Sequence, residues 1–348
     1  MKIVILHSEL ALEAGKDELD VLEQIQVVSD ALDKMNYPVQ VLPFTLNLAE
    51  IAEKLQSTRP SLVFNLVETV TGSGRLIYLA PALLDHLQIP YTGSTTEAVF
   101  LTSNKVVAKK LLRATGIKTP VWFRREDLPL GEVTRPDGTF IIKSVWEHAS
   151  IGLDEGSVVR VNGWNSLARE IDRRRQNMGG EAFAEAYVDG REFNLSIIAD
   201  NNGNPEVLPP AEIRFDRYPE GKRRVVDYRA KWETESFEYL NTPRRFQFTE
   251  EDRPLLHELK EVALQCWRLF GLRGYARVDF RVDRSGTPWV LEVNTNPCLS
   301  PDAGFAAACQ EAGLSVEQMV ARIIQWPLAE ANRLDFASLA FTPCQHVS

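Results

Sequence analysis

Residues 275–299, YARVDFRVDRSGTPWVLEVNTNPCL, have the pattern of a β-hairpin, and this segment constrains the fold more than any other. Residues 283–286, DRSG, are typical of the turn between two strands. On either side of the turn, apolar side chains recur with the two-residue period of half-buried strands, at Phe280, Val282, Trp289, Leu291 and Val293. The opposite face is then expected to carry Arg277, Asp279, Arg281, Glu292 and Asn294.

A four-residue loop places Asp279 nearly opposite Glu292. Two facing carboxylates repel each other unless a cation lies between them. Magnesium takes oxygen ligands from Asp, Glu and Asn side chains, and waters and substrate phosphates complete its octahedron. The alternative is a solvated face whose acids pair with the neighbouring arginines. Residues 294–297, NTNP, end the strand where Asn294 offers a third ligand, and this favours the metal.

Composition limits the class of protein. A chain of 348 residues is long enough for two or three domains, and its net charge of −9 argues against nucleic acid as the main partner. The four cysteines and five histidines show no zinc-ligand spacing. The first apolar run, residues 3–6, is too short for a signal peptide, and no run reaches the 18 apolar residues of a membrane helix. We therefore expect a soluble cytoplasmic protein.

The first hundred residues alternate short apolar runs with helical patterns. Strands are predicted at residues 3–6, 39–42 and 61–66, and helices at residues 19–34 and 48–55. Such alternation predicts a parallel sheet with crossover helices. The segment has neither GxGxxG after the first strand nor GxxxxGK[ST], which excludes the dinucleotide and Walker-type readings.

Two lysines further along the chain are candidates for phosphate binding. Ser103 is expected to cap a helix at residues 104–113, and Lys105 in its first turn is either ordinary surface or reaches a phosphate. Lys143 ends a strand at residues 139–143. The loop that follows, SVWEHASIG, leads to a second strand at residues 157–161, and it either covers a triphosphate or is a plain hairpin loop.

The rest of the chain mixes a second predicted hairpin with helices. Residues 182–188 and 192–199 flank an Asp-Gly turn signal, and Glu185 and Glu192 would by themselves be edge charges. Residues 205–248 read as a long irregular segment. Thr249 resembles the start of a capping box before a helix that ends near Gly271. Closing helices are predicted at residues 303–312 and 316–324, and a tail of uncertain order after Trp326.

Taken together, these residues resemble the ATP-grasp superfamily and, within it, the D-alanine–D-alanine ligases. The resemblance covers about residues 89–324, and its parts occur in the family's order. Residues 91–94, YTGS, and the helix with Lys105 look like the family's entry to its central domain. Lys143 and the loop at residues 147–152 are similar to its phosphate-covering loop.

The resemblance also implies roles for individual residues. Residues 185–188 correspond to the hinge that reads adenine, Glu192 to the acid that holds the ribose, and residues 227–232, DYRAKW, to the segment whose lysine contacts the γ-phosphate. The residues implied to bind ATP are Lys105, Lys143, Glu185, Val188, Glu192, Lys231 and Asn294. Those implied in catalysis are Arg277, which steadies the reacting acyl group, Lys231 and Ser150. The implied ligands of Mg²⁺, or of Mn²⁺ as an alternative, are Asp279, Glu292 and Asn294.

The implied fold combines α/β and α+β domains. A Rossmann-like domain with a parallel sheet is expected at residues 1–102, a central ATP-grasp domain at 103–184, a C-terminal ATP-grasp domain with the magnesium site at 185–328, and a tail at 329–348. ATP is held between two antiparallel sheets. The implied partners are a small carboxylate and an amine, joined through an acyl phosphate, with neither nucleic acid nor membrane. The family is commonly dimeric, and a homodimer stays open.

Departures from the family are concentrated where the amino-acid substrates bind. The family's Gly-Gly after the first strand is absent, residues 65–68, NLVE, replace its His-Gly loop, and Asp17 or Glu18 are the candidates for the acid that binds the first amine. The single replacements are Ala149 for a serine, Trp232 for a tyrosine, Cys298 for a glycine, and Ala303 and Gly304 for a serine and a leucine.

Three hypotheses follow. The first is a carboxylate–amine ligase with a different acid, a different amine, or both. The second is a D-alanine–D-alanine ligase with divergent contacts, and the third is a regulatory ATP-binding protein without catalysis. An intact set of site residues argues against the third, because buried charges without a partner destabilise a protein and tend to be lost with function. This set is Lys143, Arg277, Asp279, Glu292 and Asn294.

Overall fold

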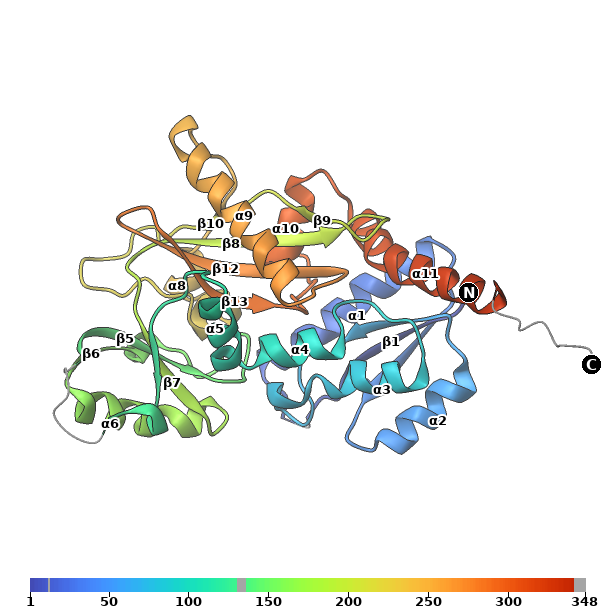
Figure 1. The fold of residues 1–348 in the computed structure, drawn as a ribbon, viewed down its shortest axis with the longest axis horizontal. Coiled ribbons are helices and arrows are strands. Elements are labelled where there is room, and N and C mark those ends of the chain that lie inside the picture. Colours follow the sequence, from blue (N-terminus) through green and yellow to red (C-terminus); the bar gives the residue numbers. More distant parts are fainter. Residues whose placement is uncertain (12, 130–135, 341–348) are drawn as a thin grey trace, which may run out of the picture.

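The computed structural model describes residues 1–11, 13–129 and 136–340, with the side chains of residues 331–340 excepted. These described residues form three sheets, one parallel and two antiparallel. In Figure 1 the parallel sheet lies at the lower right, one antiparallel sheet at the lower left, and the other antiparallel sheet above them. The expected combination of α/β and α+β architecture is confirmed. The boundaries predicted after residues 102, 184 and 328 stay a prediction, and β7 (Ala182–Ala186) extends past the second of them.

The N-terminal sheet is parallel, as the alternation of strands and helices predicted. β1 (Ile3–Ser8) lies between β2 (Val39–Phe44) and β3 (Leu62–Leu66). β1 is buried along its whole length because helices cover both faces. Ile3 and Ile5 pack with α1 (Lys16–Lys34) and α11 (Val316–Ala340), whereas Val4 and Leu6 pack with α2 (Leu48–Thr58) and α3 (Leu79–Leu87).

Within the described ranges, the central sheet has four antiparallel strands in the order β4-β7-β5-β6. Its other strands are β4 (Trp122–Arg124), β5 (Asp137–Ser144) and β6 (Val158–Asn162). β5 and β6 pair as predicted, and α6 (Trp164–Arg174) covers one face through Leu167 and Ile171.

The third sheet has the strand order β11-β10-β8-β12-β13, with β9 paired to β8. Its strands are β8 (Gly190–Ala199), β9 (Pro205–Val207), β10 (Ala211–Ile213), β11 (Arg244–Arg245), β12 (Tyr275–Asp283) and β13 (Pro288–Asn294). Its apolar face is covered by α9 (Arg253–Leu269) and α5 (Lys105–Ala114), with Phe193, Leu195 and Val278 among the buried residues. α5 also reaches the central sheet, because Val106 packs on Phe183.

The predicted hairpin at residues 182–199 is wrong. β7 and β8 belong to different sheets, and residues 187–189 carry the chain from one to the other. Each strand fills a separate core, as Phe183 and Phe193 show. Gly190, which resembles a turn glycine, lies against the Val282 carbonyl of β12, where a Cβ would clash. The glycine serves close strand packing rather than a hairpin turn.

Several predicted helix ends also change. Asn104 caps α5 by accepting bonds from the backbone N–H of Val106 and Val107, whereas Ser103 ends α4 (Thr96–Ser103). Thr249 makes no side-chain cap bond, since a short 3₁₀ turn precedes α9. α10 spans Gly304–Glu311. α11 continues through Pro327 across most of the predicted tail, and residues 341–348 lie outside the described residues.

The irregular segment predicted at residues 205–248 holds short elements. Besides β9, β10 and β11 it contains α7 (Tyr228–Trp232) and α8 (Phe237–Leu240). Elsewhere 3₁₀ turns occur at Gly74–Leu76, Arg125–Asp127, Glu155–Ser157, Arg175–Met178 and Glu250–Asp252.

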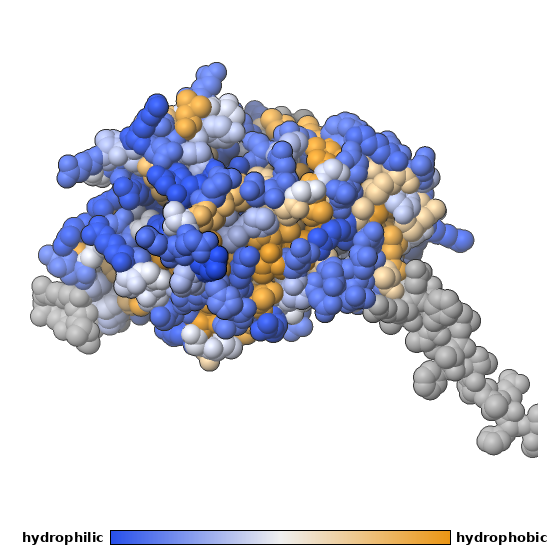
Figure 2. Space-filling view, turned by 90° about the horizontal axis from the view of Figure 1, so that it is seen from above, coloured by the Kyte–Doolittle hydropathy of each residue, from blue (hydrophilic) through white to orange (hydrophobic). Residues whose placement is uncertain are grey.

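Hydrophilic residues cover most of the face shown in Figure 2, with apolar residues gathered in a band and smaller patches. Within the described ranges, every helix falls short of the length or the apolar run that crossing a bilayer requires.

Candidate active site

A cavity of about 810 Å³ lies between the two antiparallel sheets, and α1 and Glu68, just after β3, close one side of it. Its walls include Lys143 of β5, Glu185 of β7, Arg277 of β12 and Glu292 of β13. Every ATP-binding, catalytic and metal residue predicted from the sequence lines this cavity. Residues far apart in the chain therefore meet in one space of the size expected for a small-molecule site.

The hairpin β12–β13 places its two acids as predicted. Asp279 is directly opposite Glu292, and Arg277 is opposite Asn294. A register shift after Asp279 leaves Leu291 without a cross-strand partner. This bulge corrects the predicted apolar face, because Val290 and Val293 are buried in the core while Leu291 faces the cavity.

Trp289 also leaves the predicted apolar face. It is half-buried, and its indole Nε1 donates to Asp283 Oδ2 at 2.8 Å. A bulge inside a strand reverses the alternation on its two sides, so alternation counted without it placed Trp289 and Leu291 on the wrong face.

Asp279 is buried and Glu292 is half-buried, and both line the cavity. Arg277 holds Asp279 through two bonds, Nε–Oδ1 at 2.7 Å and a terminal nitrogen to Oδ2 at 2.9 Å, and Asn194 donates to Oδ1 at 2.8 Å. Asn294 Oδ1 accepts the backbone N–H of Asn296 at 3.0 Å. The alternative of a solvated face expected the acids to pair with neighbouring arginines. Arg277 does pair with Asp279, but both residues line the cavity.

Carboxylate and amide oxygens on two adjacent strands are the donor set that a hard divalent cation requires. Asp279, Glu292 and Asn294 provide it together within the cavity. Each carboxylate oxygen keeps lone pairs beyond those used by Arg277 and Asn194. The residues present therefore fit Mg²⁺.

Lysines surround these acids: Lys105 is buried, and Lys143 and Lys231 are half-buried. Lys105 Nζ donates to the Glu147 carbonyl at 2.7 Å and lies 3.8 Å from Glu292. Burial lowers the pKa of Lys105, and burial followed by repulsion from Arg277 lowers the pKa of Lys231. Burial opposes ionisation of Glu292, but Lys105 and the other cations outweigh it and hold the pKa of this acid well below its usual range. The site thus concentrates positive charge, as a triphosphate requires.

Glu185 lies between two lysines and not at a sheet edge. Its Oε1 is 2.6 Å from Lys143 Nζ, and its Oε2 pairs with Lys109. Burial would raise the pKa of Glu185, but Lys109 and Lys143 together lower it. Lys109 was missed from the sequence, although its spacing of four residues from Lys105 places both on one face of α5.

One end of the cavity combines apolar walls with a buried acid. The apolar lining comes from Ile141, Val188, Ile213, Val225 and Leu291. Glu192 pairs with Arg281 at 2.8 Å, and burial raises the pKa of Glu192 against the pull of that arginine. An apolar slot beside a hydrogen-bonding acid suits a nucleobase and its ribose.

The loop between β5 and β6 is tied to the segment around α7. Trp232 Nε1 donates to the Ala149 carbonyl at 3.0 Å, and Ser150 Oγ donates to the Val226 carbonyl at 2.9 Å. The Tyr228 N–H donates to the Leu153 carbonyl at 3.1 Å. Ser150 lines the cavity, but its hydroxyl proton is used to anchor the loop, so its role in catalysis stays a prediction.

Neither acid candidate for the first amine lines the cavity. Asp17 accepts the Tyr228 hydroxyl at 2.8 Å, and Glu18 accepts the backbone N–H of Gly15 at 3.1 Å. Asp20 and Glu23, one turn further along α1, face the cavity instead. A step of three residues falls short of the full helical turn, so Asp20 lies to one side of Asp17 on α1, and Glu23 lies further round in the same direction.

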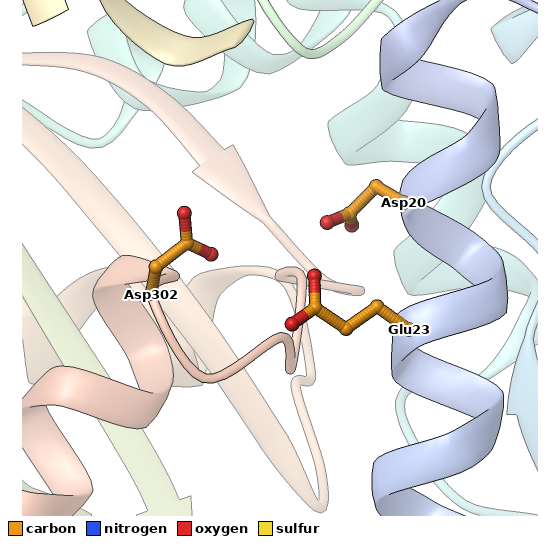
Figure 3. A group of neighbouring side chains, drawn as sticks. All are labelled: Asp20, Glu23 and Asp302. Carbon is orange, nitrogen blue, oxygen red and sulfur yellow. The ribbon is translucent and has the colours of Figure 1, made fainter. Parts of the chain in front are cut away.

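Three carboxylates meet at this end of the cavity. Asp20, Glu23 and Asp302 place carboxylate oxygens within 4.8 Å of one another, and Figure 3 shows Asp302 across from the two acids of α1. Burial, then Asp302 and Asp20, raises the pKa of Glu23. Asp20 also accepts bonds from the Cys298 thiol at 2.9 Å and the Ser300 hydroxyl at 2.8 Å.

Two further cavity residues were missed. Glu68, in the stretch that replaces the family's His-Gly loop, accepts a bond from Gln24 at 2.8 Å, and burial raises the pKa of Glu68 to about 7. His148 lines the cavity from the covering loop. Neither had a sequence signal beyond its position beside a predicted site segment.

Known proteins resemble this chain in sequence and in fold. Residues 127–325 match the family model described as the D-ala D-ala ligase C-terminus. The chain is 30% identical over 273 residues to the uncharacterized protein y4sG of Sinorhizobium fredii, covering 76% of this chain and 73% of that protein. It is 30% identical over 303 residues to the D-alanine–D-alanine ligase of Carboxydothermus hydrogenoformans, covering 84% of this chain and 89% of that enzyme.

Solved structures show the same fold. The D-alanine–D-alanine ligase of Bacillus anthracis superposes with a TM-score of 0.69 at 20% identity, over 96% of this chain and 99% of that one. The structure of the same enzyme complexed with ATP superposes with a TM-score of 0.69 at 21% identity, with the same coverage.

Proposed function

The chain belongs to the D-alanine–D-alanine ligase family, and on this premise we propose that it is an ATP-dependent ligase that joins a carboxylate to an amine and releases ADP. The observation that carries the proposal is the convergence of Lys105, Lys143, Lys231 and Arg277 with three oxygen donors in one buried cavity. Positive charge neutralises the phosphates, and the oxygen donors suit the metal that accompanies them.

The proposed reaction has two steps. A carboxylate oxygen of the first substrate attacks the γ-phosphorus of ATP, and ADP leaves with the electron pair of the broken bond. The amine of the second substrate then attacks the acyl carbon and phosphate leaves. Excluding water protects the acyl phosphate, and the covering loop held by Trp232 serves this purpose.

We assign the roles as the family resemblance implies them. Lys143 and Lys105, which line the cavity, would bind the phosphates, and Lys231 and Arg277, which also line it, would contact the reacting groups, where Arg277 would stabilise the tetrahedral oxyanion. Asp279, Glu292 and Asn294 would hold Mg²⁺, which when bound neutralises charge on the transferring phosphoryl group.

The substrate pair is proposed to differ from two D-alanines. Cys298, Ala303 and Gly304 line the cavity where the resemblance expects a glycine, a serine and a leucine. The carboxylates of Asp20, Glu23 and Asp302 make this end strongly acidic, which suits an ammonium group. The alternative is a D-alanine–D-alanine ligase, the name that the Carboxydothermus relative carries, and the homodimer stays a prediction.

The test is ADP release with Mg²⁺ and ATP across D- and L-amino acids, dipeptides and small carboxylates, with product masses read in parallel and Glu292→Gln as the blank. Stimulation by a pair other than D-alanine, with the mass of the joined product, supports the proposal. Stimulation by D-alanine alone, with a dipeptide mass, replaces it by the alternative. ATP binding with no stimulation by any pair favours a protein without catalysis.

A further inference from the structure

His148 is a buried side chain that the proposed reaction has not used. It follows Glu147 in the covering loop, lines the cavity, and buries both ring nitrogens. Among the described residues, neither Nδ1 nor Nε2 has a hydrogen-bond partner. A buried polar group without a partner destabilises the fold, so its presence calls for a ligand or another explanation.

His148 lies within the electrostatic influence of residues to which the proposed reaction gives a role. The charges that act on it come from Lys105, Glu292, Lys231 and Arg277. Burial, and then Lys105, lowers the pKa of His148 to about 3. The imidazole is therefore neutral at physiological pH, with one N–H donor and one acceptor nitrogen.

The backbone beside His148 is held in place. Ala149 and Ser150, the next two residues, both have left-handed φ angles, of 57° and 62°. Trp232 and Val226 bind these residues, and Lys105 Nζ binds the carbonyl of Glu147 on the other side. Such strained backbone persists only where its surroundings hold it, so the ring is directed into the cavity by a fixed turn.

We propose that His148 is a catalytic residue whose neutral ring donates an N–H hydrogen bond to the γ-phosphoryl group of bound ATP. The inference rests on the proposed function. The γ-phosphoryl group is the part of ATP nearest the substrate end, where Lys231 and Arg277 lie with His148. His148 neither gains nor loses a proton, and the donated bond offsets negative charge on the phosphoryl oxygens during transfer.

The experiment compares the affinities of the full chain for β,γ-imido-ATP and for ADP, both with Mg²⁺, by calorimetry. A hydrogen bond to a charged group corresponds to about tenfold or more in affinity. His148→Ala is expected to weaken the binding of imido-ATP by that factor and to leave the affinity for ADP within about twofold of wild type. His148→Gln, which keeps an N–H donor, is expected to recover part of the loss. His86→Ala, at an exposed histidine of α3, is the matched control and should change neither affinity.

Thermal unfolding separates this role from a structural one. His148→Leu removes two unpartnered nitrogens and is expected to keep or raise the Tm of the free protein, while imido-ATP binding falls. The role of His148 would be overturned if its substitution weakened the binding of both nucleotides equally, or left the ratio of the two affinities unchanged. A lower Tm together with the loss of both affinities would overturn it as well. A wild-type protein that binds neither nucleotide would instead overturn the proposed function, and this inference with it.

Discussion

At the scale of single residues, the site depends on buried charges that satisfy one another. Glu185 is 1% exposed and has a lysine on each carboxylate oxygen. Lys109, also 1% exposed, donates to Thr119 Oγ1 at 2.7 Å as well, and Thr119 donates to the Val290 carbonyl of β13 at 2.8 Å. This chain of bonds connects β7 with β13 across the two antiparallel sheets.

Removing Lys109 should therefore destabilise the protein strongly. Lys109→Met leaves one oxygen of Glu185 buried without its cation, which typically costs about 3–5 kcal/mol. Urea unfolding measures the loss, and the neighbouring exposed residue gives the control Lys110→Met, expected within about 0.5 kcal/mol of wild type. A loss below about 1 kcal/mol for Lys109→Met would contradict the pairing.

Cys298 lines the cavity, yet its thiol should react slowly. Burial, followed by the negative charges of Glu68 and Asp20, raises the pKa of Cys298 well above its usual range. The reactive thiolate is then scarce at pH 7.5 and forms only above the ordinary thiol range near pH ~8.5. Site-resolved alkylation by iodoacetamide should be slow at pH 7.5 and rise at higher pH than for a free thiol.

Asp20→Asn removes one of the charges that raises this pKa, so alkylation of Cys298 should become faster at a given pH. Asp17→Asn is the matched control, because Asp17 binds Tyr228 on another part of α1. Alkylation of wild-type Cys298 at the rate of a free thiol at pH 7.5 would contradict the prediction.

At the scale of elements, sequence patterns predicted which segments are strands and helices better than they predicted their partners. The parallel sheet and the Asp279–Glu292 pair follow from periods of 3.6 and 2, which are local. The separation of β7 from β8 does not, because Gly190 is compatible with both a turn and close packing on β12. Glu185 could not be placed as a buried ion pair until its sheet was known.

The contact between α7 and the covering loop (the loop between β5 and β6) includes a single side-chain bond, from Trp232 to Ala149, that one substitution removes. Trp232→Phe removes the N–H bond to Ala149 and should open the loop more often, at a cost of about 0.5–1.5 kcal/mol. A glutamyl endopeptidase should then cleave within residues 147–155 several-fold faster, and ATP should slow the cleavage.

Trp289→Phe is the matched control for this test, since it also removes a tryptophan N–H bond but in the turn of β12 and β13. Its cleavage rate within the covering loop should equal that of wild type. Equal rates for Trp232→Phe and wild type would show that the bond to Ala149 does not hold the loop.

At the scale of the whole molecule, the first and third sheets form one body and the central sheet has a core of its own. Ile3 and Ile5 share an apolar cluster with Ile198 and Tyr275 of the third sheet. Asn296 donates to the Val67 carbonyl at 3.1 Å, and the Leu299 N–H donates to Gln24 at 3.1 Å. The central sheet packs mainly on itself and α6, so the cavity lies along the boundary between two bodies.

A ligand that bridges this boundary should stabilise the whole chain, and the metal should be part of that effect. At about 100 times its Kd, a ligand that binds only the folded state adds about 2.7 kcal/mol. ATP with Mg²⁺ is therefore expected to raise the Tm by several degrees, and ATP with EDTA by less, because the cation that Asp279 and Glu292 would hold is then absent. Glu292→Gln should remove most of the difference in Tm between ATP with Mg²⁺ and ATP with EDTA. Glu251→Gln, at an exposed acid, should leave this difference unchanged. If ATP stabilises wild type equally with and without Mg²⁺, the three oxygen donors do not form a metal site, and the lysines alone account for nucleotide binding.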